Sequence, residues 1–323
     1  MIYINDNDVK NLNLNWNKNI QMIAEATQCI EEKDMAQPIK PYLRYRDIKN
    51  RIIAMPAFVG GPINKSGIKW IASFPDNIQK GIPRAHSVII LNEAETGLPV
   101  GIVNSGSISA IRTASVSGLM IKHYIKNRNL DKIKLGIVGF GPIGRYHLNM
   151  CNALLGENLD EVLLYDLADI DTSSIGDDIH GKITVTNSWE EAYLDADIFI
   201  TCTVSKERYI DKKPKDGSLH LNVSLRDYKP EVFPWFEKSI IVDDWEEVCR
   251  ENTDIEMFHK NMGLQEENVA AIQDIIVNDY ISSLPADQPI MFNPMGMAVF
   301  DIAIANHYLR LAEEMSQGVV LDN

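Results

Sequence analysis

The spacing of apolar residues changes along the chain and divides it into regions of different predicted structure. Over residues 16–34 apolar side chains recur at helical intervals, which predicts an amphipathic helix. From about residue 51 to 105, short runs rich in β-branched residues are separated by Gly, Pro and Asn turns, a pattern typical of an antiparallel sheet or partial barrel. These runs are RIIAMPAFV, GIKWIAS, HSVIILNE and LPVGIVN. The next segment, SGSISAIRTASVSGLMIKHYIK, is predicted to be a helix capped by one of the serines near 105–107.

From residue 132 onward, strand-like runs alternate with helical segments, which is the rhythm of βαβ units in a parallel sheet. The predicted strands are KIKLGIVG, EVLLYD, KITVT, DIFITCT and SLHLNVS. This second domain is expected to end near PIMFNPMG, and MAVFDIAIANHYLRLAEEM is predicted to be a long helix that returns to the first domain.

The length of the chain indicates its number of domains, and its net charge excludes some classes of binding partner. A chain of 323 residues can form two domains, and its net charge of −14, with dispersed basic residues, disfavours nucleic acid and anionic membranes as partners. Small molecules are better candidate partners. The N-terminal segment does not read as a signal peptide and no apolar run is long enough to span a bilayer, so a cytoplasmic protein is expected. The four cysteines are far apart, which favours reduced thiols over disulfides or a metal site, and no metal is expected.

A glycine motif lies between a predicted strand and a predicted helix. Gly139, Gly141 and Gly144 have the spacing G-x-G-x-x-G, and Asp166 ends the next predicted strand. In a dinucleotide site these glycines allow a tight turn, approach of the backbone to a pyrophosphate, and close packing of helix on strand. A carboxylate at position 166 would bind ribose hydroxyls and repel a 2′-phosphate, so NAD is favoured over NADP. The alternative is a glycine turn with no bound nucleotide.

Three charged residues are candidates for substrate binding or catalysis. Arg112 has no carboxylate at i±3 or i±4, and Lys69 lies in an apolar strand-like run, so each needs a distant partner. That partner is either an acidic residue of the chain or a substrate carboxylate. Asp227 follows a predicted parallel strand, where open α/β sheets hold their ligands, and is a candidate acid or base.

Several segments together resemble the ornithine cyclodeaminase/μ-crystallin family over almost the whole chain. They are RIIAMPAFVGG, SGIKWIASFPDN, SISAIRTASVSGLMIKHY, GIVGFGPIG, DIFITCT and NPMGMAVFDI. The resemblance implies an α/β fold in which an NAD-binding Rossmann domain, residues 113–295, is inserted in an α+β substrate-binding and dimerisation domain. That second domain comprises residues 1–112 and 296–323, and family members are typically homodimers.

The resemblance also implies roles for individual residues. It assigns to the amino-acid carboxylate Arg44, Lys69 and Arg112. It assigns to the cofactor Thr113, Gly139, Gly141, Pro142, Ile143, Gly144, Asp166, Thr203, Val223 and Ser224. Met295 matches a position at the substrate end of the nicotinamide, and Asp227 is the nearest match to the catalytic aspartate. We expect Asp227 as the first candidate for the catalytic base and Lys69 as the second.

Departures from the family pattern indicate a particular substrate. Ile53 stands where cyclodeaminases have a glutamate, and Arg84 stands where a small hydroxyl residue is usual. Together with NPMGM, these departures resemble the branch that makes L-2,3-diaminopropionate for siderophores and peptide antibiotics. Its substrate, N-((2S)-2-amino-2-carboxyethyl)-L-glutamate, carries three carboxylates, which Arg44, Lys69, Arg84 and Arg112 would bind.

The resemblance therefore predicts an NAD-dependent oxidative hydrolysis of that conjugate to 2-oxoglutarate and L-2,3-diaminopropionate. Two other activities on the same fold are alternatives, an ornithine cyclodeaminase and an alanine-type amino-acid dehydrogenase. A non-catalytic binder of NAD(P) and a small ligand, like μ-crystallin, is the alternative of another class.

Overall fold

The computed structural model of the protein describes residues 1–128, 130–173 and 175–322 and separates into two compact units. Unit 1 comprises Met1–Val116 and Gly296–Asn323, and unit 2 comprises Ser117–Met295. The sequence placed the first boundary between residues 112 and 113, whereas the units meet between 116 and 117, inside a continuous helix, α3 (Gly106–Asn127).

Unit 1 is built on a mostly antiparallel sheet with the order β16-β1-β7-β6-β5-β4-β2, in which only the pair β1 and β7 among the described strands is parallel along this path. β3 pairs with β4 on a side branch. The strands are β1 (Ile2–Asn5), β2 (Met35–Ala36), β3 (Tyr42–Leu43), β4 (Arg51–Val59), β5 (Lys65–Ser73), β6 (Ala85–Glu93), β7 (Pro99–Asn104) and β16 (Val319–Val320). The four long strands β4 to β7 are those that the sequence predicts.

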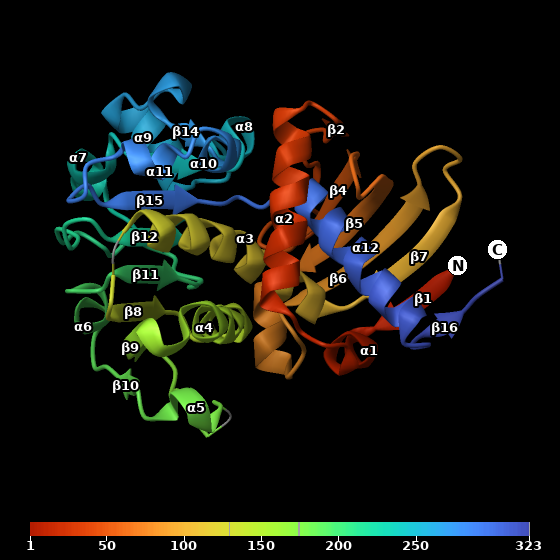
Figure 1. The fold of residues 1–323 in the computed structure, drawn as a ribbon, viewed down its shortest axis with the longest axis horizontal. Helices are drawn as coiled ribbons and strands as arrows, with labels where there is room; N and C mark the ends of the chain where they lie inside the picture. Colours follow the sequence, from red (N-terminus) through yellow and green to blue (C-terminus); the bar gives the residue numbers. More distant parts are fainter. Residues whose placement is uncertain (129, 174, 323) are drawn as a thin grey trace. The chain divides into compact units, whose positions relative to one another are not determined.

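Two long helices cover one face of this sheet. α12 packs against α2 and against β4, β5 and β6, and Figure 1 shows the two helices crossing the strands next to each other. The alternation of β4 explains this packing, because Met55, Ala57 and Val59 point toward the helices and are buried. The helical segments of this unit are α1 (Asp6–Asn11), α2 (Trp16–Glu31), the 3₁₀ turn η1 (Pro75–Lys80), the first part of α3, and α12 (Ala298–Glu314). As predicted, a serine caps α3: Ser105 Oγ accepts a hydrogen bond from Ile108 N at 3.3 Å.

Unit 2 contains a parallel sheet with the order β10-β9-β8-β11-β12-β15-β13-β14. Its strands are β8 (Ile133–Val138), β9 (Leu159–Tyr165), β10 (Ile183–Val185), β11 (Ile198–Thr201), β12 (Leu219–Asn222), β13 (Ile240–Val242), β14 (Ala270–Ala271) and β15 (Ile290–Asn293). In Figure 1 the six strands from β15 to β10 lie one below another in this order. The chain leaves β8 toward β9 and β10 and then returns to add β11 on the other side of β8, so the strand order reverses between β8 and β11. Ligands of open α/β sheets bind at the carboxyl ends of strands at such a reversal.

Short helices connect the strands of unit 2, and the longest of them in the described chain is α4, which follows β8 directly. They are α4 (Pro142–Leu155), η2 (Gly156–Asn158), α5 (Asp177–His180), α6 (Trp189–Tyr193), η3 (Pro230–Val232), α7 (Phe233–Phe236), α8 (Trp245–Val248), α9 (Asp254–Met262), η4 (Glu266–Asn268), α10 (Ile272–Val277) and α11 (Tyr280–Ser283). An aromatic-rich core that includes Phe199, Tyr228, Phe236 and Phe258 packs around the central strands. This core supports the loops that follow β11 and β12.

Candidate active site

The three glycines after β8 have the three different environments that a dinucleotide loop requires. Gly139 has φ +91°, and a Cβ there would lie 2.6 Å from the backbone carbonyl of Cys202. A Cβ on Gly144 would lie 2.2 Å from the carbonyl oxygen of Gly139, so this glycine is required for the packing of α4 on the loop. At Gly141, which caps the N-terminus of α4, a Cβ would meet no atom within 4 Å. The loop is therefore open where a phosphate would approach the helix N-terminus.

Asp166 follows β9 directly and contacts the glycine loop. Its Oδ2 accepts a hydrogen bond from Phe140 N at 2.6 Å, and its Oδ1 accepts one from Ala168 N at 3.0 Å. The side chain is half-buried and lies at the edge where a ribose would bind in a Rossmann site. Pro142 and Ile143 form the first turn of α4, the former exposed and the latter half-buried.

Asp227 is completely buried and accepts hydrogen bonds from two hydroxyl groups. Thr203 Oγ1 donates to Oδ1 at 2.5 Å, and Ser224 Oγ donates to Oδ2. Burial raises the pKa of Asp227, although the hydrogen bonds from Ser224 and Thr203 act in the opposite direction. The structure thus brings together three of the predicted site residues, and Val223 precedes Ser224 in the same loop, half-buried.

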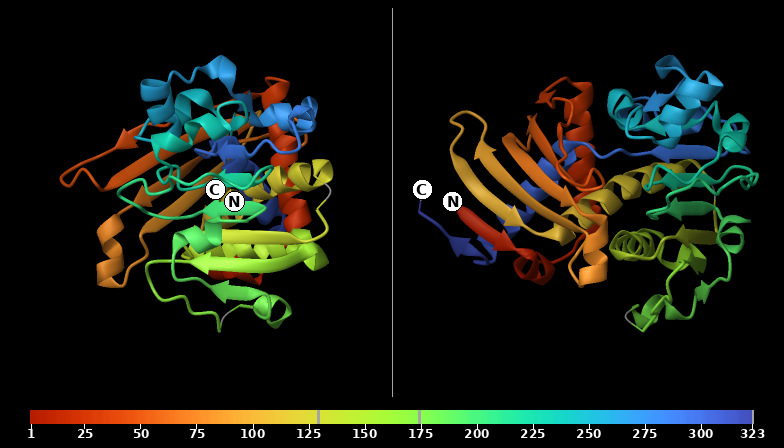
Figure 2. Two further views of the ribbon diagram at one scale, coloured as in Figure 1. Left: turned by 90° about the vertical axis from the view of Figure 1, so that its left-hand side faces the viewer. Right: turned by 180° about the vertical axis from the view of Figure 1, so that it is seen from behind.

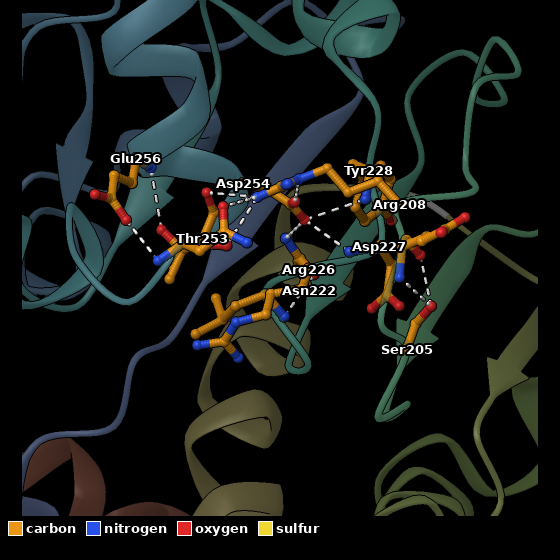
Figure 3. A network of polar contacts seen from close by, with 12 residues as sticks. Ser205, Arg208, Asn222, Arg226, Asp227, Tyr228, Thr253, Asp254 and Glu256 are labelled. Carbon is orange, nitrogen blue, oxygen red and sulfur yellow. Dashed lines mark hydrogen bonds and ion pairs between the residues drawn. The ribbon is translucent and has the colours of Figure 1, made fainter. Parts of the chain in front are cut away.

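A second buried aspartate, Asp254, accepts hydrogen bonds from the backbone of the loop that contains Asp227. The sequence analysis did not identify this residue. Asp254 Oδ1 accepts a hydrogen bond from Arg208 Nε at 2.6 Å. Its Oδ2 accepts bonds from Asn222 Nδ2 at 3.0 Å, Asp227 N at 3.0 Å and Tyr228 N at 3.1 Å (Figure 3). Burial raises the pKa of Asp254 to about 6, against the opposing effect of the Tyr228 amide and the Arg208 guanidinium.

Lys69 and Arg112 share an acidic partner in unit 1. Lys69 Nζ lies 2.8 Å from Asp301 Oδ1, and Arg112 Nε lies 2.9 Å from the same oxygen. Lys69 also donates to Ser109 Oγ at 2.8 Å. The exposed fractions are 1% for Lys69, 8% for Arg112 and 1% for Asp301. Of the two partners that the sequence left open, the structure therefore shows an acidic residue of the chain, supplied by α12.

Burial and the neighbouring charges together set the pKa values of this cluster. Burial lowers the pKa of Lys69 to about 8, while Asp301 raises it and the nearby Arg112 and Lys40 lower it further. Burial alone would raise the pKa of Asp301, but Arg112 and Lys69 outweigh that effect and hold its pKa below the ordinary value. One buried carboxylate thus faces two buried cations, and Lys69 is the group that titrates nearest to neutral pH.

Gly296 shapes the surroundings of Arg112. It has φ +90°, and a Cβ there would lie 2.9 Å from Arg112 Nη1 and 3.1 Å from Nη2. Its carbonyl oxygen accepts a hydrogen bond from the buried Lys40 Nζ at 2.8 Å. This explains why NPMG contains a glycine: any side chain at position 296 would displace the guanidinium.

The other predicted site residues lie around these clusters or outside them. Arg44 is exposed, and its guanidinium carbon lies 5.2 Å from the centre of the Tyr42 ring. Arg84 directly precedes β6 and is half-buried, and neither arginine takes part in the shared contact with Asp301. Thr113 donates to Ser109 O at 2.8 Å in α3, one residue after Arg112. Met295, in unit 2, is half-buried and its amide donates to Asp243 Oδ1 at 2.9 Å.

Ile53 lies on the same face of the unit 1 sheet as Lys69. In the antiparallel ladder of β4 and β5, Met55 pairs with Lys69, and Ile53, two residues before Met55, pairs with Ile71, two residues after Lys69. The position where cyclodeaminases carry a glutamate is therefore a neighbour of the buried lysine and is apolar here.

Two buried acids of these clusters, Asp301 and Asp254, stand at positions where the sequence itself indicates a structural role. Asp301 is the one charged residue in the apolar run MAVFDIAIAN, and Asp254 follows Thr253 at the start of a helix. An isolated acid in an apolar helical segment is costly unless it is paired, so it indicates a buried cation elsewhere in the chain.

The part of the chain that the structure describes has neither a metal-binding cluster nor a membrane-spanning helix. No group of three or more His, Cys, Asp or Glu side chains is arranged to hold a metal ion among residues 1–128, 130–173 and 175–322. Within the same residues, no helix combines the length and the apolar character that crossing a bilayer requires.

Comparison with known proteins identifies similar sequences and folds. A model of the ornithine cyclodeaminase/mu-crystallin family matches residues 4–314. The N-((2S)-2-amino-2-carboxyethyl)-L-glutamate dehydrogenase of Staphylococcus aureus is 32% identical over 335 aligned positions, which cover 100% of this chain and 98% of that protein.

Two solved structures show the same fold across their whole length. The Delta(1)-pyrroline-2-carboxylate reductase of Thermococcus litoralis, in complex with NADH and L-proline, matches with a TM-score of 0.88 and 22% identity, covering 99% of this chain and 100% of that one. An archaeal alanine dehydrogenase dimer with bound NAD matches with a TM-score of 0.81 and 21% identity, covering 100% and 99%. This likeness confirms the predicted fold class.

Proposed function

The chain belongs to the ornithine cyclodeaminase/μ-crystallin family, and we propose that within it the protein is an NAD-dependent enzyme that oxidises the CH–NH group of an amino-acid conjugate. The conjugate is N-((2S)-2-amino-2-carboxyethyl)-L-glutamate, the compound named in the similar Staphylococcus aureus dehydrogenase. With one NAD⁺ and one water it yields 2-oxoglutarate, L-2,3-diaminopropionate, NADH and a proton. The diamino acid is a building block for siderophores or peptide antibiotics.

The buried pair of cations in unit 1 carries this proposal. Lys69 and Arg112 share a single carboxylate, so their site retains a net positive charge that burial makes unfavourable without an anion. A substrate carboxylate supplies that anion, and the terminal nitrogens of Arg112 can donate to it because Asp301 is contacted through Nε. Arg44 and Arg84 are the proposed ligands of the further carboxylates.

The glycine loop of unit 2 fits a dinucleotide. The open space at Gly141 and the N-terminus of α4 would hold the pyrophosphate, and Asp166 would hold the ribose hydroxyls. When bound, NAD⁺ would supply the acceptor for the hydride from the glutamate Cα. Thr113, Thr203, Val223 and Ser224 are the further cofactor residues that the proposal includes.

Lys69 and Asp227 are the two proposed groups for proton transfer. With a pKa of about 8, a fraction of Lys69 is neutral near pH 7 and can accept a proton from the amine or from the attacking water. Asp227, the first candidate from the sequence, is the other group, since burial raises the pKa of its carboxylate. The apolar Ile53 beside Lys69 supports a substrate other than ornithine, whose side-chain ammonium would favour a carboxylate there.

A turnover assay with three substrates tests the proposal. Purified protein is incubated with NAD⁺ and the conjugate, ornithine or alanine, and NADH and 2-oxoglutarate are measured. We expect equal amounts of both products from the conjugate, loss of activity in Lys69→Met, and retained activity in Lys65→Met, a partly exposed lysine of the same strand that pairs with Glu93. Proline and ammonia from ornithine without net NADH would contradict the proposal, as would NADH binding without turnover of any substrate.

We also propose that the protein forms a homodimer through the sheet of unit 1. On the face opposite α12, apolar side chains are paired across neighbouring strands, and Trp70 is 44% exposed. The right-hand view of Figure 2 looks onto this face, with the orange and yellow strands in front of the blue α12. The apolar residues of the face are Ile68, Trp70, Val88, Ile90 and Ile102.

A second copy of the chain is the occupant we propose for this face, because the archaeal alanine dehydrogenase with this fold is a dimer. Sedimentation equilibrium should give twice the mass of the chain. A charge in the patch, as in Ile90→Glu, should shift the equilibrium to monomers, and a monomer for the unmodified protein would contradict the proposal.

A further inference from the structure

Asp254 joins two loops that carry the predicted chemistry of unit 2. One loop follows β11 and contains Thr203 and Arg208, and the other follows β12 and contains Ser224 and Asp227. Arg208 Nε donates to Asp254 Oδ1, and the amide of Asp227 donates to Asp254 Oδ2. One fully buried carboxylate therefore connects the loops at the carboxyl ends of neighbouring parallel strands.

The loop after β12 is held at its base as well. Asn222, the last residue of β12, donates from Nδ2 to Asp254 Oδ2 at 3.0 Å and to Asn293 Oδ1 at 2.8 Å. Its Oδ1 accepts a hydrogen bond from Leu225 N at 3.0 Å, and Asp254 N donates to Leu225 O at 2.8 Å. Both backbone polar groups of Leu225 are thus engaged.

Leu225 has φ +65°, a left-handed conformation that costs a non-glycine residue about 1 kcal/mol or more. The two hydrogen bonds of its backbone hold this conformation. It turns the chain so that Ser224 and Asp227 meet, with the Ser224 hydroxyl donating to Asp227 Oδ2. Asn222 Oδ1 supplies the acceptor for the Leu225 amide, and Asp254 supplies a backbone donor for the Leu225 carbonyl and a carboxylate acceptor for the Asp227 amide, so loss of these contacts would let the loop relax.

We propose that Asp254, with Arg208 as its partner, is a positioning residue for the proposed reaction: it fixes the loops after β11 and β12 so that Thr203 and Ser224 both donate to Asp227. The inference rests on the proposed function for its catalytic consequence. Asp254 itself is fully buried beneath Arg208, Asn222 and the loop backbone, so its proposed effect passes through Asp227 (Figure 3).

The variant Asp254→Asn removes the charge and places a donor group among four donors. We expect the backbone amides of Asp227 and Tyr228 to exchange with deuterium at least about tenfold faster, because an acceptor is lost. We expect kcat to fall by about 10²-fold, the effect of a misplacement near 1 Å, while KM for the conjugate changes by less than about threefold because its proposed carboxylate ligands lie in unit 1.

Asp197 offers a matched control in the same unit. It is buried, its Oδ1 lies 2.6 Å from Lys215 Nζ, and its Oδ2 accepts a hydrogen bond from Lys134 N at 2.9 Å. It precedes β11 and so lies at the opposite end of the strands from Asp254. Asp197→Asn should lower the melting temperature with kcat and the exchange of the Asp227 amide unchanged.

Variants of Arg208 separate positioning from general stability. Arg208→Gln should reduce kcat by a smaller factor than Asp254→Asn does. Arg208→Lys should have a higher kcat than Arg208→Gln, because an ammonium group can donate to Asp254 Oδ1. Unchanged amide exchange in Asp254→Asn would overturn the inference, as would faster exchange with unchanged kcat, or an equal loss of kcat in Asp197→Asn. If the unmodified protein does not oxidise the conjugate, the proposed function fails, while amide exchange still decides whether Asp254 fixes the loop.

Discussion

Replacing Asp301 by asparagine tests the electrostatic account of the Lys69 site most directly. Asparagine has nearly the same shape as aspartate but no charge, so Lys69 and Arg112 would lose the carboxylate that they share. Removing one partner of a buried ion pair costs about 3–5 kcal/mol of stability. The melting temperature should fall, but the effect of interest is on the protonation of Lys69.

The distance in the structure sets the size of that effect. Two unit charges 2.8 Å apart, the separation of Lys69 Nζ and Asp301 Oδ1, attract each other by about 6 kcal/mol at an effective dielectric constant near 20. One pKa unit corresponds to about 1.4 kcal/mol, so the full loss would lower the pKa of Lys69 by about 4 units. Relaxation and entry of water reduce this value, and we expect a fall of at least about 1 unit from the pKa of about 8 in the unmodified protein.

The pH dependence of kcat/KM for the conjugate measures this change. If neutral Lys69 is the proton acceptor, kcat/KM rises with pH through the pKa of the free enzyme. In Asp301→Asn that rise should move to lower pH, because the protonated lysine is no longer stabilised. Glu93→Gln, which removes the partner of the less buried Lys65 in the same sheet, is the control and should leave the profile in place. A rise in Asp301→Asn that stays near pH 8, or moves to higher pH, would refute the reasoning.

Stability should respond to the same group with a defined sign. The pKa of Lys69 is about 8 in the folded protein and 10.5 in the unfolded chain, so between these values the unfolded chain binds more protons. This lysine therefore destabilises the fold below pH 8, and that effect is relieved as pH rises from 8 to 10.5. The free energy of unfolding of Lys69→Met, measured by urea denaturation, should lack this rise.

Two pairs of glycine variants test the binding loops. Gly141→Ala should leave the melting temperature unchanged and weaken NADH binding at least about tenfold, whereas Gly144→Ala should destabilise the protein, because its Cβ would meet a carbonyl oxygen at 2.2 Å. If both variants bind NADH as tightly as the unmodified protein, the loop does not hold a dinucleotide. Gly296→Ala should raise KM for the conjugate about tenfold or more by displacing Arg112, whereas Gly97→Ala, which also has positive φ but no neighbour within 4 Å, should lower stability and leave KM unchanged. Equal KM values in these two variants would show that Arg112 does not depend on Gly296.

The local pattern of the chain predicts the parts of the fold that depend on local rules. The strands β4 to β7 are runs rich in β-branched residues that are bounded by Gly, Pro and Asn turns, and this signal can be read from sequence. β13 was not predicted, because its three residues, Ile240–Val242, form a shorter run than the roughly four to eight residues of a strand signal. β1 and β16 are short strands at one end of the sheet, and their pairing with each other joins residues near opposite ends of the sequence. No local pattern indicates such a pairing.

The glycine loop was readable for a related reason. The backbone conformation at Gly139 and the close contact at Gly144 each require a glycine at that position. Such a requirement is visible in the sequence. Thr203, Ser224 and Asp227 are different, since each is an ordinary polar residue near the end of a strand. They meet only because β11 and β12 are neighbours in a parallel sheet.

The partner of Lys69 also depends on contacts between residues that are distant in the sequence. The sequence showed that Lys69 and Arg112 each need a distant anion, but Asp301 is 232 residues from the first and 189 from the second, and no spacing rule spans such distances. Because Asp301 occupies Arg112 Nε, the substrate carboxylate of the proposed function would be left with the terminal nitrogens of the guanidinium. The internal carboxylate would then not compete with the substrate for the whole arginine. Since Asp301 holds the arginine and the lysine in place, less side-chain entropy would be lost when such a substrate binds.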